Sequence, residues 1–180
     1  MYIARDSNYV ALNQYKNIYF LGVGGVGMSG LAGWCWEKKY NVGGYDRDES
    51  EFTVRLKSKG ILINHHLSIE AIPEQFLNKQ ETLIVYTPAI KKDHKLYSFF
   101  KKKNFKIIKR SELLRQISLD YKVIAISGTH GKTTISIMLS HILKSAGLGP
   151  NAFFGGTSIN DDTNFLIGKS DYMIIEADEY

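Results

Sequence analysis

Cysteine is almost absent from this sequence, which carries a single thiol at Cys35. One cysteine forms no internal disulfide, so the sequence favours a reducing compartment, and we expect a cytoplasmic protein. The start of the chain contains Arg5, Asp6 and Lys16 and lacks the apolar core of a signal peptide, which argues against export. The sequence also has no internal repeat and no low-complexity tract. These absences exclude a disulfide-stapled secreted domain and a solenoid.

Charge is missing from one long stretch, the 19 residues from Ile18 to Trp36. That length is close to a membrane span of about 20 residues. Six of the 19 residues are glycine, however, and a glycine loop explains them better. We therefore expect no membrane-spanning segment and no membrane partner.

Basic residues outnumber acidic ones, which gives a net charge of +5, and three of the lysines are consecutive, Lys101 to Lys103. A nucleic-acid-binding protein with a lysine-rich face would show steep salt-dependent affinity for polyanions. No aromatic ladder or nucleic-acid motif accompanies the lysines, and they end a helix-like segment. We expect no nucleic-acid partner, because a mild basic excess also suits a protein that handles phosphorylated ligands.

Strand-like and helix-like runs alternate along the chain, as is typical of parallel α/β proteins. The sequence predicts a Rossmann-like parallel-sheet domain over residues 1–109 and a linker at 110–120. A P-loop ATP-binding α/β domain is expected to begin at 121 and to be truncated at 180. Expected strands are 18–22, 41–45, 61–64, 82–86, 105–108, 121–126, 151–154 and 172–175. Expected helices are 28–39, 50–59, 94–103, 111–117 and one after the second glycine loop, with Ser50 and Ser111 as N-caps and Gly60 as a C-cap.

The first glycine loop is Gly22-Val23-Gly24-Gly25-Val26-Gly27, which follows one expected strand and precedes a helix. Glycines in this G-x-G-x-x-G pattern permit a tight turn and close approach of the backbone to a diphosphate. Asp46 ends the next strand, where an acid can hold a ribose hydroxyl. The loop therefore predicts a ligand with a diphosphate and a ribose, which is either a dinucleotide or a nucleotide-diphosphate sugar.

The second glycine loop is Gly128-Thr129-His130-Gly131-Lys132-Thr133-Thr134, which lies between an apolar run and an amphipathic segment. Backbone amides of such a loop bind phosphates at a helix N-terminus. Lys132 is expected to reach the outer phosphates of ATP, and the Thr133 hydroxyl to bind Mg²⁺. The expected core face of the helix is formed by Ile135, Met138, Leu139, Ile142, Leu143 and Ala146.

An apolar strand runs into acidic residues at the end of the sequence. Beside a phosphate loop, such a strand normally carries the group that holds Mg²⁺. Strand alternation places Glu176 and Asp178 on one side and Glu179 on the other. We expect Glu176 to hold the metal and, with Lys132, to act in catalysis.

Two further sets of residues follow expected strands of the first unit, His65-His66 and Thr87-Pro88-Ala89. Ligands of open α/β sheets bind at these carboxyl ends of strands. No Cys or His lies at metal-ligand spacing from the two histidines, so a hydrogen-bonding or surface role is expected there. The sequence carries no pattern that specifies an oligomeric state.

Taken together, these motifs resemble the Mur ligases of peptidoglycan synthesis. The resemblance covers the chain from about Lys16 onward. Its pieces are Gly22 to Gly30, Thr87 to Ile90, Arg110 to Leu113, Gly128 to Thr134, Gly155-Gly156 and Glu176 to Glu179.

The resemblance implies an ATP- and Mg²⁺-dependent ligase that joins L-alanine to the carboxylate of UDP-N-acetylmuramate through an acyl phosphate. The first loop would then cradle the substrate diphosphate, and His65 or His66 with Thr87 to Ala89 would line the sugar-nucleotide cleft. Lys132 would stabilise the transferring phosphoryl group, with Thr133 and Glu176 on the metal. Family members also have a longer central domain and a C-terminal domain, so we expect these 180 residues to be inactive alone.

Two alternatives remain open on the sequence. One is the recycling ligase of the same family, which attaches a ready-made tripeptide to the same nucleotide sugar. The other is an NAD-binding regulatory module in which the second glycine loop is only a turn.

Overall fold

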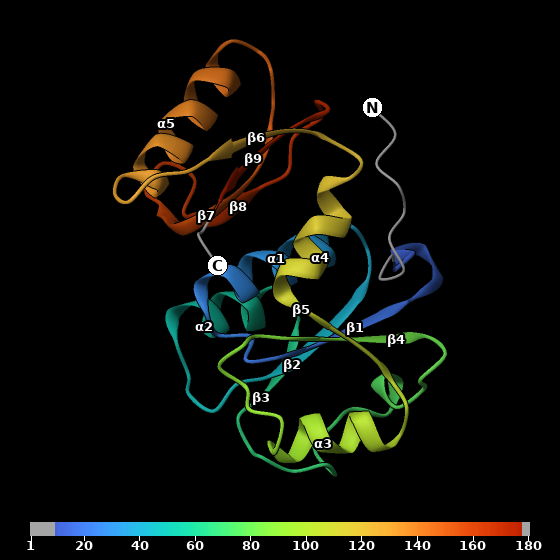
Figure 1. Cartoon of the computed structure of the whole chain (residues 1–180). Coiled ribbons are helices and arrows are strands. Elements are labelled where there is room, and N and C mark those ends of the chain that lie inside the picture. Colours follow the sequence, from blue (N-terminus) through green and yellow to red (C-terminus); the bar gives the residue numbers. More distant parts are fainter. Residues whose placement is uncertain (1–9, 178–180) are drawn as a thin grey trace.

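A computed structural model describes residues 10–177 of the chain, as two sheets joined by helices (Figure 1). The first sheet is fully parallel, with the strand order β3-β2-β1-β4-β5. This order is that of a Rossmann-like unit, so the predicted fold class is confirmed. The strands are β1 (Asn17–Leu21), β2 (Asn41–Tyr45), β3 (Leu62–Asn64), β4 (Thr82–Tyr86) and β5 (Lys106–Lys109). The helices of this half are α1 (Val26–Glu37), α2 (Glu51–Ser58), α3 (Lys95–Lys102) and α4 (Arg110–Ser118), with short 3₁₀ turns at Leu12–Gln14 and Glu74–Phe76.

Side-chain alternation along β1 divides the first half into two cores. Ile18 and Phe20 pack with α1, α2 and α4, whereas Tyr19 and Leu21 pack with α3 and the second 3₁₀ turn. Both faces of the strand are therefore buried. A parallel strand buried on both faces has a continuous apolar sequence, which is why this strand was recognisable.

Local sequence explains the ends of these helices. Ser50 caps α2, and its hydroxyl accepts a hydrogen bond from the Thr53 amide, as expected. Gly60 follows the end of α2 with a φ of +91°, which favours glycine. The prediction for Ser111 is wrong, because α4 begins one residue earlier, at Arg110. Glu112 instead satisfies this helix end by accepting the Lys109 amide at 2.6 Å.

The second sheet has the order β6-β9-β7-β8, with only β8 antiparallel to its neighbour. Its strands are β6 (Lys122–Ile126), β7 (Asn151–Ser158), β8 (Thr163–Leu166) and β9 (Tyr172–Glu176), and α5 (Lys132–Ser145) covers one face. The β7–β8 hairpin replaces the polar loop expected between residues 154 and 172. Asp162 turns the chain there with a φ of +47°, a conformation that Asp tolerates better than most residues.

Helix α1 lies between the two sheets (Figure 1). Its apolar side chains share one core with β1 and β4 and with Phe153, Phe165 and Met173 of the second sheet. A Cβ at Gly33 would overlap the Phe165 ring, so the hairpin packs directly on the helix backbone. The uncharged stretch of the sequence covers most of β1 and α1. It lacks charge because β1 is buried on both faces and α1 is buried between the two sheets. Among residues 10–177, no helix is long and apolar enough to cross a membrane.

The expected core face of α5 is partly wrong. Leu139 and Leu143 do pack against the second sheet, and the fully buried positions of the helix are Ser136 and Ser140. The exposed side of α5 carries the other apolar stripe, formed by Ile135, Met138, Ile142 and Ala146. Helical spacing alone does not distinguish two apolar stripes when small serines occupy the buried side.

Helix α4 leads from the first sheet to the second. Leu113 and Ile117 are buried in the core that includes α1, so this segment packs as part of the first half. The division of the chain into domains at 110–120 stays a prediction.

Candidate functional site

The second glycine loop connects β6 to α5 through two residues with positive φ. Gly128 has a φ of +141° and Gly131 a φ of +78°, and α5 begins directly afterwards at Lys132. Within residues 10–177, the backbone amides of Gly128, Thr129, His130 and Gly131 donate no hydrogen bond. The loop is exposed. Unpaired amides at a helix N-terminus suit an anion, and phosphate binding by this loop stays a prediction.

Lys132 lies across this loop. Its Nζ donates a hydrogen bond to the Gly128 carbonyl at 2.7 Å. The ammonium is therefore held at the mouth of the loop. Thr134 is exposed on the first turn of the helix, beside it.

Thr133 and Glu176 meet across the second sheet, although 43 positions separate them in sequence. The Thr133 hydroxyl donates to Glu176 Oε2 at 3.0 Å, and the Gly155 amide donates to Glu176 Oε1 at 2.7 Å. A Cβ at Gly155 would lie 2.6 Å from Glu176 Oε2, so only glycine leaves room for this arrangement. The strand end, the loop and the helix thus hold one carboxylate in place.

These two groups have the chemistry of a magnesium site. Mg²⁺ prefers hard oxygen ligands and is usually held by one or two protein groups together with phosphates and water. A hydroxyl and a carboxylate already in contact match that pattern. Within the described residues, no cluster of three or more His, Cys, Asp or Glu side chains offers another metal site. Asp178 and Glu179, also considered from the sequence, lie outside the described residues.

The first glycine loop opens at the carboxyl end of β1. The amides of Gly22 and Val23 donate to the Tyr45 carbonyl and fix the turn. Among the hydrogen bonds of residues 10–177, none comes from the amides of Gly25, Val26 and Gly27, which begin α1. These three amides are therefore available for an anion.

Asp46 directly follows β2, at the position that its spacing suggested, and its carboxylate contacts the backbone nearby. Its Oδ2 accepts the Gly24 amide at 2.7 Å, and its Oδ1 accepts the Asp48 amide at 3.2 Å. Both oxygens thus brace the glycine loop and the turn after β2. Its remaining acceptor sites are available for a ribose hydroxyl, so that role stays a prediction.

The neighbouring residues His65 and His66 differ in exposure and in contacts. His65 Nδ1 lies 2.9 Å from the Asp46 carbonyl, and its Nε2 is buried without a hydrogen-bond partner in the described structure. Glu49 Oε2 is the nearest carboxylate, at 3.7 Å from that nitrogen. His66 is exposed. The structure therefore brings His65 to Asp46, whose side chain holds the first glycine loop, and leaves His66 in solvent.

The Thr87-Pro88-Ala89 segment forms a turn next to the first glycine loop. The Thr87 carbonyl accepts the Ile90 amide at 2.9 Å, which closes the turn. A Cβ at Gly22 would collide with the Thr87 methyl group, so these two residues touch. Pro88 and Ala89 are exposed beside them.

A cavity of about 250 Å³ lies between the ends of the two glycine loops. Val26 and Gly27 line one side, and Thr133, Gly155 and Glu176 line the other. Sequence reasoning placed both loops at ligand sites, and the structure brings the end of each loop to one cavity.

Arg110 also lines this cavity and was assigned no role from the sequence. It appeared only as part of a matching motif at the expected linker. The signal that could have found it is a positive charge beside a helix N-terminus, where the helix dipole favours an acid.

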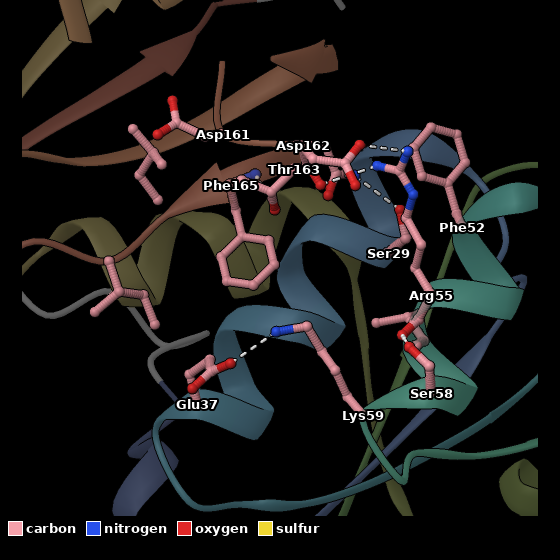
Figure 2. A pocket seen from close by; sticks show the side chains of 14 residues that line it. Ser29, Glu37, Phe52, Arg55, Ser58, Lys59, Asp161, Asp162, Thr163 and Phe165 are labelled. Atoms are coloured by element: carbon pink, nitrogen blue, oxygen red, sulfur yellow. Dashed lines mark hydrogen bonds and ion pairs between the residues drawn. The ribbon is translucent and has the colours of Figure 1, made fainter. Parts of the chain in front are cut away.

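A larger cavity, of about 670 Å³, lies away from both loops, between α1, α2 and the β7–β8 hairpin (Figure 2). Its charged groups are paired: Arg55 with Asp162 at 2.8 Å, and Lys59 with Glu37 at 2.8 Å. Asn164, which also lines it, donates to the Val26 carbonyl at 2.6 Å. This cavity lies at the packing interface between the β7–β8 hairpin and the helices α1 and α2.

Comparison with known proteins agrees with this geometry. A model described as "Mur ligase family, catalytic domain" matches residues 17–122. A curated UDP-N-acetylmuramate–L-alanine ligase from Christiangramia forsetii is 46% identical over 170 residues, which cover 94% of this chain and 38% of the relative.

Two solved structures share the fold. The UDP-N-acetylmuramate-alanine ligase of Thermotoga maritima superposes with a TM-score of 0.80 at 27% identity, over 89% of this chain and 37% of its own. A UDP-N-acetylmuramate:L-alanyl-gamma-D-glutamyl-meso-diaminopimelate ligase from Neisseria meningitides has a TM-score of 0.82 at 26% identity, over 92% of this chain and 53% of its own. Since the family model covers more than half of the sequence and its two glycine loops meet in one cavity, the chain belongs to the Mur ligase family.

Proposed function

We propose that the protein containing this chain joins L-alanine to the carboxylate of UDP-N-acetylmuramate, with hydrolysis of ATP, in peptidoglycan precursor synthesis. The chain spans 38% of the length of the Christiangramia forsetii relative, so the proposal concerns the whole protein. The observation that carries it is the cavity shared by the two glycine loops. A ligase needs a nucleotide-sugar and a triphosphate at one place, whereas an NAD-binding module has no use for the second loop.

ATP is assigned to the second glycine loop. Amides of Gly128 to Gly131 would bind the phosphate tail, with the amides and hydroxyls of Thr133 and Thr134 at the start of α5. Lys132 would exchange its bond to the Gly128 carbonyl for phosphate oxygens and stabilise charge on the transferring group. Thr133 and Glu176 would hold Mg²⁺, which when bound neutralises phosphate charge.

UDP-N-acetylmuramate is assigned to the first glycine loop. The amides of Gly25, Val26 and Gly27 would accept its diphosphate at the N-terminus of α1. The turn at Thr87 and the His65 imidazole, whose Nε2 makes no hydrogen bond in the described structure, would contact the nucleotide. With the diphosphate there, the muramoyl carboxylate extends into the cavity toward Thr133.

The chemistry then proceeds in two balanced steps. A carboxylate oxygen attacks the γ-phosphorus of ATP, the bond to the β,γ-bridging oxygen breaks, and an acyl phosphate and ADP are formed. The amine of L-alanine attacks the acyl carbon, inorganic phosphate leaves with its bonding electron pair, and the nitrogen loses a proton to a base or water. In the first step this chain contributes positioning and neutralisation of charge, which dominate phosphoryl transfer.

L-alanine is favoured over a tripeptide as the amine substrate. The curated relative at 46% identity is named for L-alanine, whereas the solved structures of the two types are equally distant, at 27% and 26% identity. A cytoplasmic location is part of the proposal because nucleotide-sugar precursors and ATP occur there.

Phosphate release by the full-length gene product tests the proposal. With ATP, Mg²⁺ and UDP-N-acetylmuramate present, L-alanine should support turnover and the tripeptide should not. Turnover with the tripeptide alone would favour the recycling ligase. Tight binding of NAD without any binding of UDP-N-acetylmuramate would overturn the ligase assignment altogether.

A further inference from the structure

The Arg110 side chain lies against the first glycine loop. A Cβ added at Gly27 would overlap the Arg110 guanidinium, so the group packs directly on the backbone at the start of α1. Its other surroundings are the walls of the shared cavity, including Thr133 and Glu176. A positive charge thus lies between the place assigned to the diphosphate and the place assigned to the γ-phosphate.

This guanidinium has no anionic partner among residues 10–177. Glu176, the carboxylate of the same cavity, is engaged by the Thr133 hydroxyl and the Gly155 amide. Glu112, on the same helix, accepts the Lys109 amide. Half-buried arginines are usually paired, because their five donors need acceptors.

The local field makes this position unfavourable for a cation in the absence of a ligand. Arg110 is the first residue of α4, and it faces the first residues of α1, so the positive ends of two helix dipoles lie beside it. The unpaired amides of Gly25, Val26 and Gly27 add further donors. An anion between these groups would relieve the repulsion.

We propose that Arg110 binds an oxyanion of the nucleotide-sugar substrate, either its diphosphate or its carboxylate, through a charge-assisted contact across the first glycine loop. The planar guanidinium suits both groups, since each presents two oxygens to a bidentate donor. This inference rests on the proposed function, because it takes UDP-N-acetylmuramate as the ligand. It adds a residue from the end of the first half to a site otherwise built from the glycine loop.

Calorimetric titration of the full-length wild-type protein and variants tests the inference. The variants are Arg110→Gln, Arg110→Lys and, as a matched control on the same helix, Arg115→Gln, which lies outside the cavity. Each protein is titrated with UDP, UDP-N-acetylglucosamine and UDP-N-acetylmuramate at about 0.15 M salt, where long-range charge effects are screened. Thermal unfolding midpoints show whether each variant keeps its fold.

We expect Arg110→Gln to weaken binding of UDP-N-acetylmuramate by about tenfold or more, Arg110→Lys to weaken it less, and Arg115→Gln to leave it unchanged. If Arg110 contacts the diphosphate, all three ligands weaken together. If it contacts the carboxylate, only UDP-N-acetylmuramate weakens, because UDP-N-acetylglucosamine lacks that group.

Two results would overturn the inference while leaving the proposed function intact. One is unchanged binding of all three ligands by a folded Arg110→Gln variant. The other is an equal loss in Arg115→Gln, which would indicate a general effect of charge. If the wild-type protein binds none of the three ligands, the proposed function fails and this inference fails with it.

Discussion

Replacing Gly155 by alanine is the most specific perturbation of the Thr133–Glu176 pair. Gly155 is exposed and has no positive φ, so the backbone accepts alanine without strain. The new methyl group, however, would lie 2.6 Å from Glu176 Oε2 and 3.1 Å from Thr133 Oγ1. Glu176 must therefore move away from both partners.

The size of the effect follows from the role of the Gly155 amide, which orients Glu176 at 2.7 Å. Groups that orient a metal ligand typically contribute 10- to 100-fold in metal affinity or activity, or about 1.4 to 2.8 kcal/mol. We expect Mg²⁺-dependent ATP binding to weaken by about that factor, with little change in the unfolding midpoint.

Titration with a fluorescent ATP analogue, with Mg²⁺ and with EDTA, measures this effect. Gly156→Ala is the matched control, since its Cβ would approach only the Thr133 methyl group, at 3.4 Å. Wild-type affinity in Gly155→Ala, or an equal loss in Gly156→Ala, would refute the proposed metal site.

Three further predictions concern the fold. Gly33→Ala inserts a methyl group into the Phe165 ring and should lower the free energy of unfolding by about 1–3 kcal/mol in urea titrations. Gly30→Ala is the control and should cost less, because its Cβ would lie 3.4 Å from Asn164, an ordinary contact distance. Equal losses would contradict the close packing of α1 on the hairpin. Burial raises the pKa of the Cys35 thiol, so a thiol reagent at pH 8 should label the chain only as fast as it unfolds; rapid labelling of the folded protein would contradict it. Burial also lowers the pKa of His94 below its ordinary value of 6.5. As the pH falls, His94 is therefore protonated in the unfolded state before it is protonated in the folded state, and stability should fall below about pH 6.5. In urea titrations between pH 7.5 and 5.5, His94→Gln should remove part of that loss, and an unchanged pH profile would exclude His94 as a cause.

The first sheet was predictable because its strands are buried on both faces. Such strands have uninterrupted apolar sequences, and glycine turns separate them from amphipathic helices. The expected strand at 82–86 agrees with β4 residue for residue. Both glycine loops were also recognisable, because their positions between strand and helix are fixed by chain order alone.

The hairpin and the exposed stripe of α5 were not predictable from local patterns. Residues 160–162 are polar, and the strand on either side is short or interrupted by glycine, so the segment resembles a loop. Only packing on α1 makes it a hairpin. On α5, the sequence shows which residues are apolar but not that the sheet lies against Ser136 and Ser140.

The site was predictable in its parts and not in its assembly. Thr133 and Glu176 were paired by analogy with other phosphate loops, whereas the placement of Gly155 beside Glu176 depends on the order of strands in the second sheet. The role of Arg110 was still less predictable, because 83 positions in sequence separate it from Gly27, on which its guanidinium packs. No periodicity or spacing in the sequence reports such a contact.

A crystal structure with UDP-N-acetylmuramate, Mg²⁺ and a non-hydrolysable ATP analogue tests the central claim most directly. The account predicts the sugar-nucleotide diphosphate on the amides of Gly25 to Gly27 and the analogue's γ-phosphate beside Thr133 and Glu176, with the muramoyl carboxylate in the cavity between them. A structure in which either glycine loop binds no phosphate, or in which the two ligands occupy separate cavities, would contradict it.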